Sequence, residues 1–598
     1  MHRTSLFVSL ALLSSTTIAQ AQATKVESQL LVTGETGMEF SVSPHGGHVA
    51  VVTQKGSRWV VIYDGTVGPL FDEIPNSSYK IIWSPDGSRW AYIGRIGREY
   101  TVMVDGKEQL KVPATDETGI AGVLSKGGPT PTFTQDSKHF VYGIQVVGPG
   151  PGGARFREIR VVYDGVVGPP NGGDGPIVAY PVEGPHHAYL ITARAQTALN
   201  PTGQDKQLLV VDGKVAPYVA GDLQYTADGT HLFSQRTVVI PGKGGVTELL
   251  VDGRPVMRAQ AIRVFTAPAG NAFVAVVSQQ PQPGVNNSFL VVGATRIPGT
   301  DCGGGYASVT FSADGKHYAA PCQVGSGMVQ MVIDGKMGRE YRMINEFAFS
   351  PDGTHSMYKA FAGKTFVVTG EAESDGYQAV DSLRFGGTHT GFLATKASGS
   401  SPWEVVIDGK SMPRSDATAA SLFKLSPDGS HWAYITGFGN AVGLALDGVD
   451  QPMATIRGFQ RDWHGARFVW SADSKHFATF GTSKSMPNYD DSGIFFDGKF
   501  LKLNVNYAFN PTFTPDGKHF LFLTQDPGNS KESVYVDGKV VVQVDVNNSL
   551  ADNPAAWEVG ADGVLTLVAQ DAGAIKRFRI TPGTDTSIET LLAMGKKP

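Results

Sequence analysis

The chain has 598 residues, of which 41% are hydrophobic and 18% are charged, and its formal net charge is -5. This composition excludes a disordered acidic chain and a strongly basic nucleic-acid binder, and the length exceeds that of one ordinary domain. The 73 glycines and 35 prolines, with aromatic residues at 10%, are typical of many short strands joined by tight turns rather than of a helical bundle.

The first segment has the features of a secretory signal peptide. Arg3 supplies positive charge, residues 6–13 are mostly apolar, and Ala21 and Ala23 have the small-residue spacing of a cleavage site. The apolar run is too short for a membrane-spanning helix, which needs about 20 residues, and no later stretch is comparable. We therefore expect residues 1–23 to be removed on export. The mature chain is then periplasmic or secreted, without a transmembrane segment.

A short motif recurs along the rest of the chain. It has the form Ser-Pro-Asp-Gly, usually with an aromatic residue before it and His two positions after its glycine, and its best copies begin at Ser84, Ser312, Ser350, Ser426 and Thr514. Thirteen units can be aligned between His48 and Leu565. Their mean spacing of roughly 43 residues matches the period of a four-stranded propeller blade.

Most units carry a second signal, an apolar run that ends in Asp-Gly, as at Asp105, Asp334 and Asp537. Asp-Gly between apolar strands is typical of a type I′ hairpin turn, which requires a positive φ at both central residues. Each unit therefore contains two predicted hairpins, the first joining strands A and B and the second joining strands C and D. The predicted fold is all-β, with four-stranded antiparallel blades arranged as propellers.

The Ser-Pro-Asp-Gly units resemble the WD40-like (PD40) repeats of TolB-type periplasmic propellers and of the propeller domains of prolyl oligopeptidase and tricorn-type proteases. The resemblance covers all thirteen units and implies a propeller fold, but its motif is structural and implies little about activity. Because propellers usually have about 4–8 blades, we expect two tandem propellers of about six and seven blades. The sixth unit is the most degenerate and precedes the Gly-rich residues 299–305. The predicted first propeller is 24–303 and the second is 304–598.

Ten of the 14 histidines follow the first turn of a unit at the same register. We interpret them as structural residues whose ring bonds the turn backbone or the Asp of Ser-Pro-Asp-Gly. Asp545, Asn547 and Ser549 begin like a calcium loop, but Leu550 stands where such a loop needs glycine. We therefore predict no metal site.

Sequence motifs of enzymes are also missing. The chain contains no nucleophile elbow, zinc helix or phosphate-binding loop, and Gly148, Gly150 and Gly153 match a dinucleotide motif by letter only, with prolines between them. We predict no cofactor.

The chain has two cysteines, Cys302 and Cys322. The predicted topology places Cys322 at the end of strand B of the seventh unit. Cys302 lies in the connection that precedes this unit, on the same face of the propeller. An oxidising compartment is expected to join the two cysteines in a disulfide.

The loops opposite the turns differ in length and composition, and rigid scaffolds usually carry function on such loops. In the first half, the B–C loops are long and rich in Gly, Pro and Gln, at residues 147–157, 195–206, 238–245 and 279–287. In the second half, two loops supply the candidate ligand-binding residues Trp463, His464, Tyr489, Asp490 and Asp491. Aromatic rings beside His and carboxylates suit a sugar, a peptide or a cation. In the alternative interpretation, Trp463 packs on its own blade and the charges are solvated.

Two classes of function are open. The first is an exported, non-enzymatic binding or scaffold protein, similar to TolB-type propellers, that recognises a protein or an envelope glycan through the variable loops. The alternative is an enzyme or sensor whose site lies at a propeller mouth and acts on a glycan or peptide. The sequence identifies neither the partner nor the oligomeric state.

Overall fold

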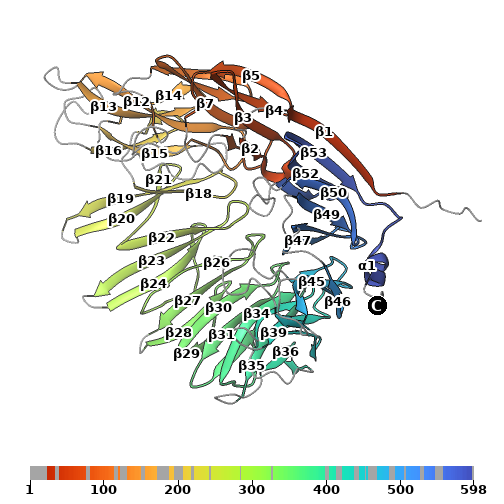
Figure 1. The fold of residues 1–598 in the computed structure, drawn as a ribbon. Helices are drawn as coiled ribbons and strands as arrows, with labels where there is room; N and C mark the ends of the chain where they lie inside the picture. Colours follow the sequence, from red (N-terminus) through yellow and green to blue (C-terminus); the bar gives the residue numbers. More distant parts are fainter. Residues whose placement is uncertain are drawn as a thin grey trace, which may run out of the picture.

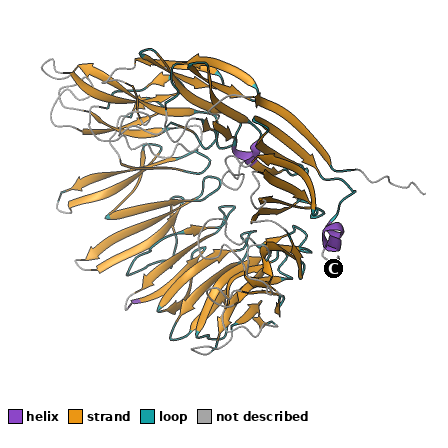
Figure 2. Cartoon of the chain, in the orientation of Figure 1, coloured by secondary structure: helices purple, strands orange, loops and turns teal. Residues whose placement is uncertain are grey.

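The computed structural model describes residues 23–594 except for 34–38, 76–80, 114–118, 122–130, 150–154, 172–186, 194–205, 217–220, 242–243, 283–284, 325–326, 397–402, 413–419, 437–442, 452, 456–467, 484–491, 504–506, 526–530 and 546–555. The predicted signal peptide lies outside the described residues except for Ala23. The fold is all-β, and the described strands form thirteen antiparallel sheets that follow one another around a propeller ring (Figures 1 and 2). The predicted fold class and the thirteen units are thus confirmed.

We number the blades in chain order. Blades one to four contain β2 (Glu39–Val42), β3 (Val49–Lys55), β4 (Arg58–Tyr63) and β5 (Thr66–Phe71); β6 (Ile82–Trp83), β7 (Trp90–Ile96), β8 (Glu99–Val104) and β9 (Lys107–Pro113); β10 (Gly119–Ala121), β11 (Thr132–Phe133), β12 (Phe140–Pro149), β13 (Arg155–Tyr163) and β14 (Val166–Val167); and β15 (Ala188–Ala193), β16 (Lys206–Val211) and β17 (Lys214–Val215). Blades five to eight contain β18 (Gly221–Tyr225), β19 (Leu232–Ile240), β20 (Gly244–Val251) and β21 (Arg254–Ala259); β22 (Ala261–Thr266), β23 (Phe273–Gln282), β24 (Val285–Val292) and β25 (Thr295–Arg296); β26 (Thr310–Phe311), β27 (Tyr318–Val324), β28 (Met328–Ile333) and β29 (Lys336–Tyr341); and β30 (Met343–Phe349), β31 (Ser356–Phe361), β32 (Thr365–Thr369) and β33 (Ala372–Glu373).

Blades nine to twelve contain β34 (Ala379–Gly386), β35 (His389–Thr395), β36 (Glu404–Ile407) and β37 (Lys410–Ser411); β38 (Ala420–Leu425), β39 (Trp432–Thr436), β40 (Gly443–Leu446) and β41 (Val449–Asp450); β42 (Met453–Thr455), β43 (Val469–Trp470), β44 (Phe477–Ser483), β45 (Ser492–Phe496) and β46 (Lys499–Lys502); and β47 (Tyr507–Phe513), β48 (Phe520–Gln525), β49 (Lys531–Val536) and β50 (Lys539–Asp545). In most blades the four strands are consecutive and correspond to A, B, C and D.

Both ends of the chain build blade thirteen. β51 (Trp557–Val559), β52 (Leu565–Asp571) and β53 (Ala574–Thr581) supply its first three strands, and β1 (Lys25–Thr33) supplies the fourth. β1 pairs antiparallel with β53, from Lys25 opposite Thr581 to Thr33 opposite Ala574. The first described strand therefore completes the last blade, and the ring closes at this sheet (Figure 1).

The two predicted hairpins of a unit are present. At the second turn of blade two, Asp105 and Gly106 have φ of 50° and 74°, the positive values that a type I′ turn requires. Three of the predicted B–C loops, 147–157, 238–245 and 279–287, consist largely of paired strand at their described residues. The pairs β12–β13, β19–β20 and β23–β24 extend there as long hairpins beyond the ring (Figure 1). We call the side of the ring with the A–B and C–D turns the turn face. The side with the B–C and D–A connections is the loop face.

The apolar core lies between neighbouring blades. One cluster joins Ile407 of blade nine with Trp432 of blade ten, and another joins Leu290 of blade six with Val332 of blade seven. Blades six and seven thus pack against each other as other neighbours do. The division of the chain into 24–303 and 304–598 stays a prediction.

A short helix, α1 (Ile588–Met594), follows the last blade. Ile588 and Leu591 are buried in a cluster with Leu501 and Leu503 of blade eleven, so the helix is fixed to the ring. In the part of the chain that the structure describes, no helix has the length and apolar character needed to span a membrane.

Candidate functional site

The predicted ligand-binding residues lie outside the described part of the chain. Trp463 and His464 belong to residues 456–467, and Tyr489, Asp490 and Asp491 belong to residues 484–491. Their role stays a prediction. The two faces of the ring can nevertheless be compared at the described residues.

On the turn face, the polar groups of a blade bond one another, as blade ten illustrates. The Ser426 hydroxyl accepts a hydrogen bond from the His431 backbone N–H (3.0 Å) and donates one to the Asp428 carboxylate (2.7 Å). His431 Nδ1–H donates to Asp447 Oδ2 at 2.8 Å, and the Trp432 backbone N–H donates to Asp447 Oδ1 at 2.9 Å. The His of the first turn and the Asp of the second turn therefore connect the two hairpins. We call this pair the turn bracket.

The predicted partner of the histidine ring, the turn backbone or the Asp of Ser-Pro-Asp-Gly, is wrong. That Asp is occupied by the hydroxyl and backbone N–H groups of its own loop. Pairing of strands B and C brings the histidine beside the second turn instead. The bracket recurs with Nδ1–Oδ2 distances of 2.6–2.8 Å in His48–Asp64, His139–Asp164, His231–Asp252, His317–Asp334, His389–Asp408, His431–Asp447, His476–Asp497 and His519–Asp537.

Four blades depart from this pattern at described residues, and His186 of blade four lies outside the described residues. Blade thirteen has no histidine after its first turn, and Ala572 stands at the second-turn position with a φ of 51°. In blade two, Arg89 replaces the histidine and its Nε donates to Asp105 at 2.8 Å. In blade six both positions are changed, to Ala272 and Gly293. In blade eight the histidine remains as His355, but a glycine replaces the aspartate and the ring Nδ1 lies 2.8 Å from Thr354 Oγ1.

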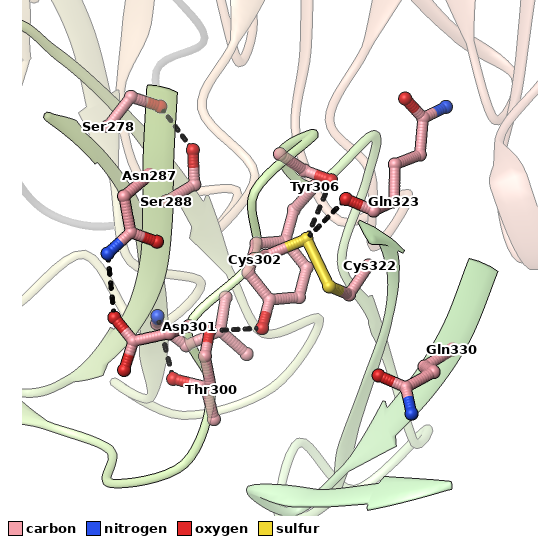
Figure 3. Close-up of a disulfide and its surroundings, with 12 residues drawn as sticks. Ser278, Asn287, Ser288, Thr300, Asp301, Cys302, Tyr306, Cys322, Gln323 and Gln330 are labelled. Atoms are coloured by element: carbon pink, nitrogen blue, oxygen red, sulfur yellow. Dashed lines mark hydrogen bonds between the residues drawn. A yellow bond between two sulfur atoms is a disulfide. The ribbon is translucent and has the colours of Figure 1, made fainter. Parts of the chain in front are cut away.

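The predicted disulfide is confirmed on the loop face. Cys302 and Cys322 are bonded with a Cα–Cα distance of 5.7 Å, and neither is exposed to solvent (Figure 3). Cys302 forms a β-bridge with Ser288 of blade six, while Tyr306 forms one with Cys322 of blade seven. The connection between the two blades is therefore bonded to both. Carbonyl oxygens of Gly305 and Gln323 lie 3.1 and 3.2 Å from Cys302 Sγ as close contacts, because a disulfide sulfur carries no hydrogen to donate.

A polar pocket of about 410 Å³ opens beside this disulfide. Its lining consists of hydroxyl, amide, guanidinium and backbone groups from Gln260, Arg263, Ser278, Gln279, Ser288, Gly304, Gly305 and Tyr306. The Ser278 and Ser288 hydroxyls are 2.8 Å apart (Figure 3). Arg263 donates to the carbonyl oxygens of Tyr306 and Ala307, the second at 3.2 Å. The guanidinium thus fixes the wall of the pocket.

Tyr306 fixes the connection between blades six and seven. Its ring is 3% exposed and its hydroxyl donates to the Thr300 carbonyl oxygen at 2.7 Å. Burial, the main cause, raises the pKa of Tyr306 well above its ordinary value. The phenol therefore stays protonated. The described lining residues supply hydrogen-bond donors and acceptors and a positive charge, and none of these described residues is a carboxylate or a histidine.

Sequence reasoning did not identify Arg263, Ser278 or Ser288. Two signals pointed to the region, because the variable loop 279–287 and the disulfide both belong to the loop face. The pocket needed a further fact, the path of the connection between blades six and seven, which the sequence does not encode as a motif.

No protein-family model and no curated protein matches the chain. Among solved structures, the chain is similar to the β-propeller domain of the Trilobed protease from Pyrococcus furiosus, with 12% identity, 46% of this chain and 95% of that chain covered, and a TM-score of 0.23. It is also similar to the Dos1 propeller, with 10% identity, coverage of 53% and 92%, and a TM-score of 0.25. For the tricorn protease the identity is 12%, the coverage is 74% and 46%, and the TM-score is 0.22. Similarities at this level carry no argument about function.

Proposed function

We propose that this propeller is an exported, non-enzymatic binding or scaffold protein that recognises a protein or an envelope glycan through its loop face. The observation that carries the proposal is the difference between the two faces. On the turn face, carboxylates, histidines and hydroxyls of the repeat bond one another, as in blade ten. On the loop face, the described residues of the pocket beside Cys302 present hydroxyl, amide and guanidinium groups, with no acid–base pair among them.

Arg263 is the residue in this pocket best suited to recognition. Both of its hydrogen bonds go to carbonyl oxygens, so these bonds do not neutralise its positive charge. The hydrogen bond of 2.8 Å between the Ser278 and Ser288 hydroxyls uses only one of their two protons, so the accepting hydroxyl can still donate to a ligand. Such a set of groups suits the hydroxyl, amide and carboxylate groups of a glycan or a peptide.

Export is the second part of the proposal. A disulfide with both sulfurs buried fits an oxidising compartment, in agreement with the predicted signal peptide and a periplasmic or secreted location. The resemblance to PD40 and TolB-type repeats supports the same setting. Trp463 and Asp490 lie outside the described residues, and on the sequence pattern alone we propose that they belong to the same binding surface.

The test uses the mature chain, immobilised and exposed to envelope extract and to soluble peptidoglycan fragments. Arg263→Gln removes a charge from the loop face, and Lys518→Gln removes one from the turn face, where the Lys518 side chain is 75% exposed. We expect a specific partner to be retained by wild type and Lys518→Gln and to be lost or weakened at least tenfold with Arg263→Gln. Equal retention by both variants contradicts the loop-face proposal.

The same samples test the alternative function. Cleavage of the peptidoglycan fragments or of an added peptide by the wild-type chain, lost in Asp490→Asn, identifies an enzyme and overturns the non-enzymatic proposal. We expect no such turnover.

A further inference from the structure

A cavity of about 530 Å³ lies between blades seven and eight, on the turn face and independent of the proposed loop-face function. Its inner wall is apolar and aromatic, formed in part by Met331, Tyr341, Tyr358 and Val368, each of which is at most 4% exposed. Charged side chains surround its mouth, among them Arg339 and Glu373. A cavity of several hundred Å³ with this lining has the size and character of a small-ligand site.

The cavity exists because one side chain of the repeat is small. In other blades the residue after the first-turn histidine is usually large and packs between neighbouring blades, as Trp90, Trp432 and Phe477 do. We call this position the wedge residue. In blade ten this residue is Trp432, which packs in one cluster with Ile407 of blade nine and Tyr434 of its own blade. Blade eight has Ser356 at this position. The two residues that contact the wedge residue in blade ten have counterparts here. Ile333 of blade seven corresponds to Ile407, Tyr358 corresponds to Tyr434, and both line the cavity.

In blade two an indole ring, that of Trp90, occupies the space that is empty in blade eight. Trp90 stacks on Tyr63 of blade one with ring centroids 4.5 Å apart and on Tyr92 of its own blade at 5.4 Å. Tyr358 takes the place of Tyr92 in blade eight, and its hydroxyl lies 3.3 Å from the position that a Cβ on Gly338 would occupy. The aromatic floor of the slot is therefore preserved while the intervening ring is lost.

A second departure from the repeat opens the same cavity. Gly370, with a φ of 58°, stands where other blades have the aspartate of the turn bracket, and it lines the cavity together with Ser356. The ring of His355 is bonded to Thr354 instead of crossing to the second turn. Two independent losses of side-chain volume thus coincide at one site, whereas blade six, which also lost its bracket, retains the large residue Phe273 as its wedge.

The mouth of the cavity is held in place by hydrogen bonds. Arg339 donates to both carboxylate oxygens of Glu373 at 3.0 and 3.1 Å, and the Tyr341 hydroxyl donates to the same carboxylate at 2.5 Å. The Arg339 side chain is 72% exposed and Lys336 and Glu371 are exposed beside it. Positively and negatively charged side chains at the mouth can form hydrogen bonds with the peptide groups of a ligand whose ring is buried in the cavity.

We propose that this cavity binds an aromatic ring of indole size carried by a peptide, the ring taking the place that Trp90 and Trp432 fill in their own blades. The ligand class is a tryptophan-containing peptide. Its ring would lie against Ile333 and Tyr358, and its peptide groups would reach the charged mouth.

The test uses fluorine NMR with the mature chain and two probes, N-acetyl-5-fluorotryptophanamide and 5-fluoroindole. For wild type, we expect the line of each probe to broaden and shift in a saturable manner. Ser356→Trp places the missing ring in the cavity, so we expect binding of both probes to weaken at least tenfold. The melting temperature of this variant should be unchanged or higher. Val540→Trp adds a ring at a site on β50 that is 47% exposed, and it should leave binding unchanged.

A reciprocal variant keeps the test decisive if Ser356→Trp does not fold. Trp432→Ser empties the equivalent slot of blade ten, and we expect indole to raise the melting temperature of this variant more than that of wild type. No saturable binding to wild type, or binding that Ser356→Trp or the smaller Ser356→Leu leaves unchanged, overturns the proposal. Binding of 5-fluoroindole without the tryptophanamide overturns the assignment to a peptide.

Discussion

In blade ten the two turns are bonded to each other and a tryptophan fills the space toward the preceding blade, whereas blade eight has lost both features. Gly370 of blade eight stands at the position of Asp447 in blade ten, and Ser356 stands at the position of Trp432. The first turn is the same Ser-Pro-Asp-Gly loop in both blades. Because the neighbouring side chains differ little, the two blades form a natural pair. Their difference shows that the repeat sequence maintains the scaffold and that departures from it mark places where the scaffold is left open.

Blade six is a third case, and it carries the largest expected effect. It lacks the turn bracket, but the adjoining connection carries the disulfide between residues 20 positions apart. Replacing Cys302 and Cys322 together with serine should lower the free energy of unfolding by about 3 kcal/mol in the chain-entropy model. Urea unfolding of the oxidised wild type and the double variant measures this change. A reduced wild type that unfolds like the variant is the control, and equal stability of all three contradicts the prediction.

Converting blade ten toward blade eight should have the next largest effect. Asp447→Gly removes the acceptor of both the His431 ring and the Trp432 backbone N–H. Since hydrogen bonds to charged groups contribute about 1.5–3 kcal/mol, we expect a loss of about 2 kcal/mol in the free energy of unfolding. The reciprocal change, Gly370→Asp, should stabilise blade eight, because the φ of 58° at this position is close to that of the bracket aspartates. Destabilisation by Gly370→Asp would show that the two blades differ in more than the bracket.

The two histidines give a smaller contrast. His431→Ala removes one ring bond to Asp447 and should lower the free energy of unfolding by about 1 kcal/mol. His355→Ala removes a bond to the exposed Thr354 only, so its effect should be clearly smaller. Chemical denaturation of the two variants in parallel provides the comparison. Equal losses would mean that the rings stabilise their own turns rather than the connection between turns.

Acid should act on both kinds of blade alike, because both keep the first turn. Hydrogen bonds from the Ser350 hydroxyl, followed by those from Thr354, lower the pKa of Asp352 from 3.8 to about 2. The hydroxyl of Ser471 is the main cause of the same lowering, to about 2, for Asp473 in the regular blade eleven. Because the folded pKa lies below the unfolded one, the stabilisation is complete above pH 4 and is lost as the pH falls from 4 to 2.

The measurement is the urea midpoint at pH 5, 3 and 2. The midpoint should fall over this range in wild type and fall less steeply in both Asp352→Asn and Asp473→Asn. A change in only one of the two variants would separate the first turns of regular and irregular blades.

The fold was predictable because a fixed motif recurs at a fixed spacing. Ser-Pro-Asp-Gly and Asp-Gly identify the turns directly, and the register of the strands then placed Cys302 and Cys322 on one face. The partner of the histidine was not predictable in this way, because it depends on how two separate hairpins meet at one end of the sheet. Closure by β1 was missed for a related reason, since that strand has no turn motif to connect it with β53.

The cavity escaped the sequence analysis because the eighth unit contains one of the best copies of the first turn, from Phe349 to Gly353. The unit is unusual at two positions outside this motif. Ser356 is small where most units have a large residue, and Gly370 stands where most units have the second-turn aspartate. The first position is the wedge residue, directly after the first-turn histidine, and the second belongs to the second turn, so neither is part of Ser-Pro-Asp-Gly.

The pairing of β1 with β53 also sets the order of assembly. β1 is synthesised before the other strands of its blade and remains without its neighbour until β53 has been made, so until then it presents an unpaired edge. Such long-range closure is slow, because the two ends must meet after the intervening chain has folded. A chain shortened by loss of β53 would expose the edges of β1 and β52 together, and unpaired strand edges pair with those of other chains. The closing blade is therefore the point at which errors in synthesis would convert a ring into an aggregate.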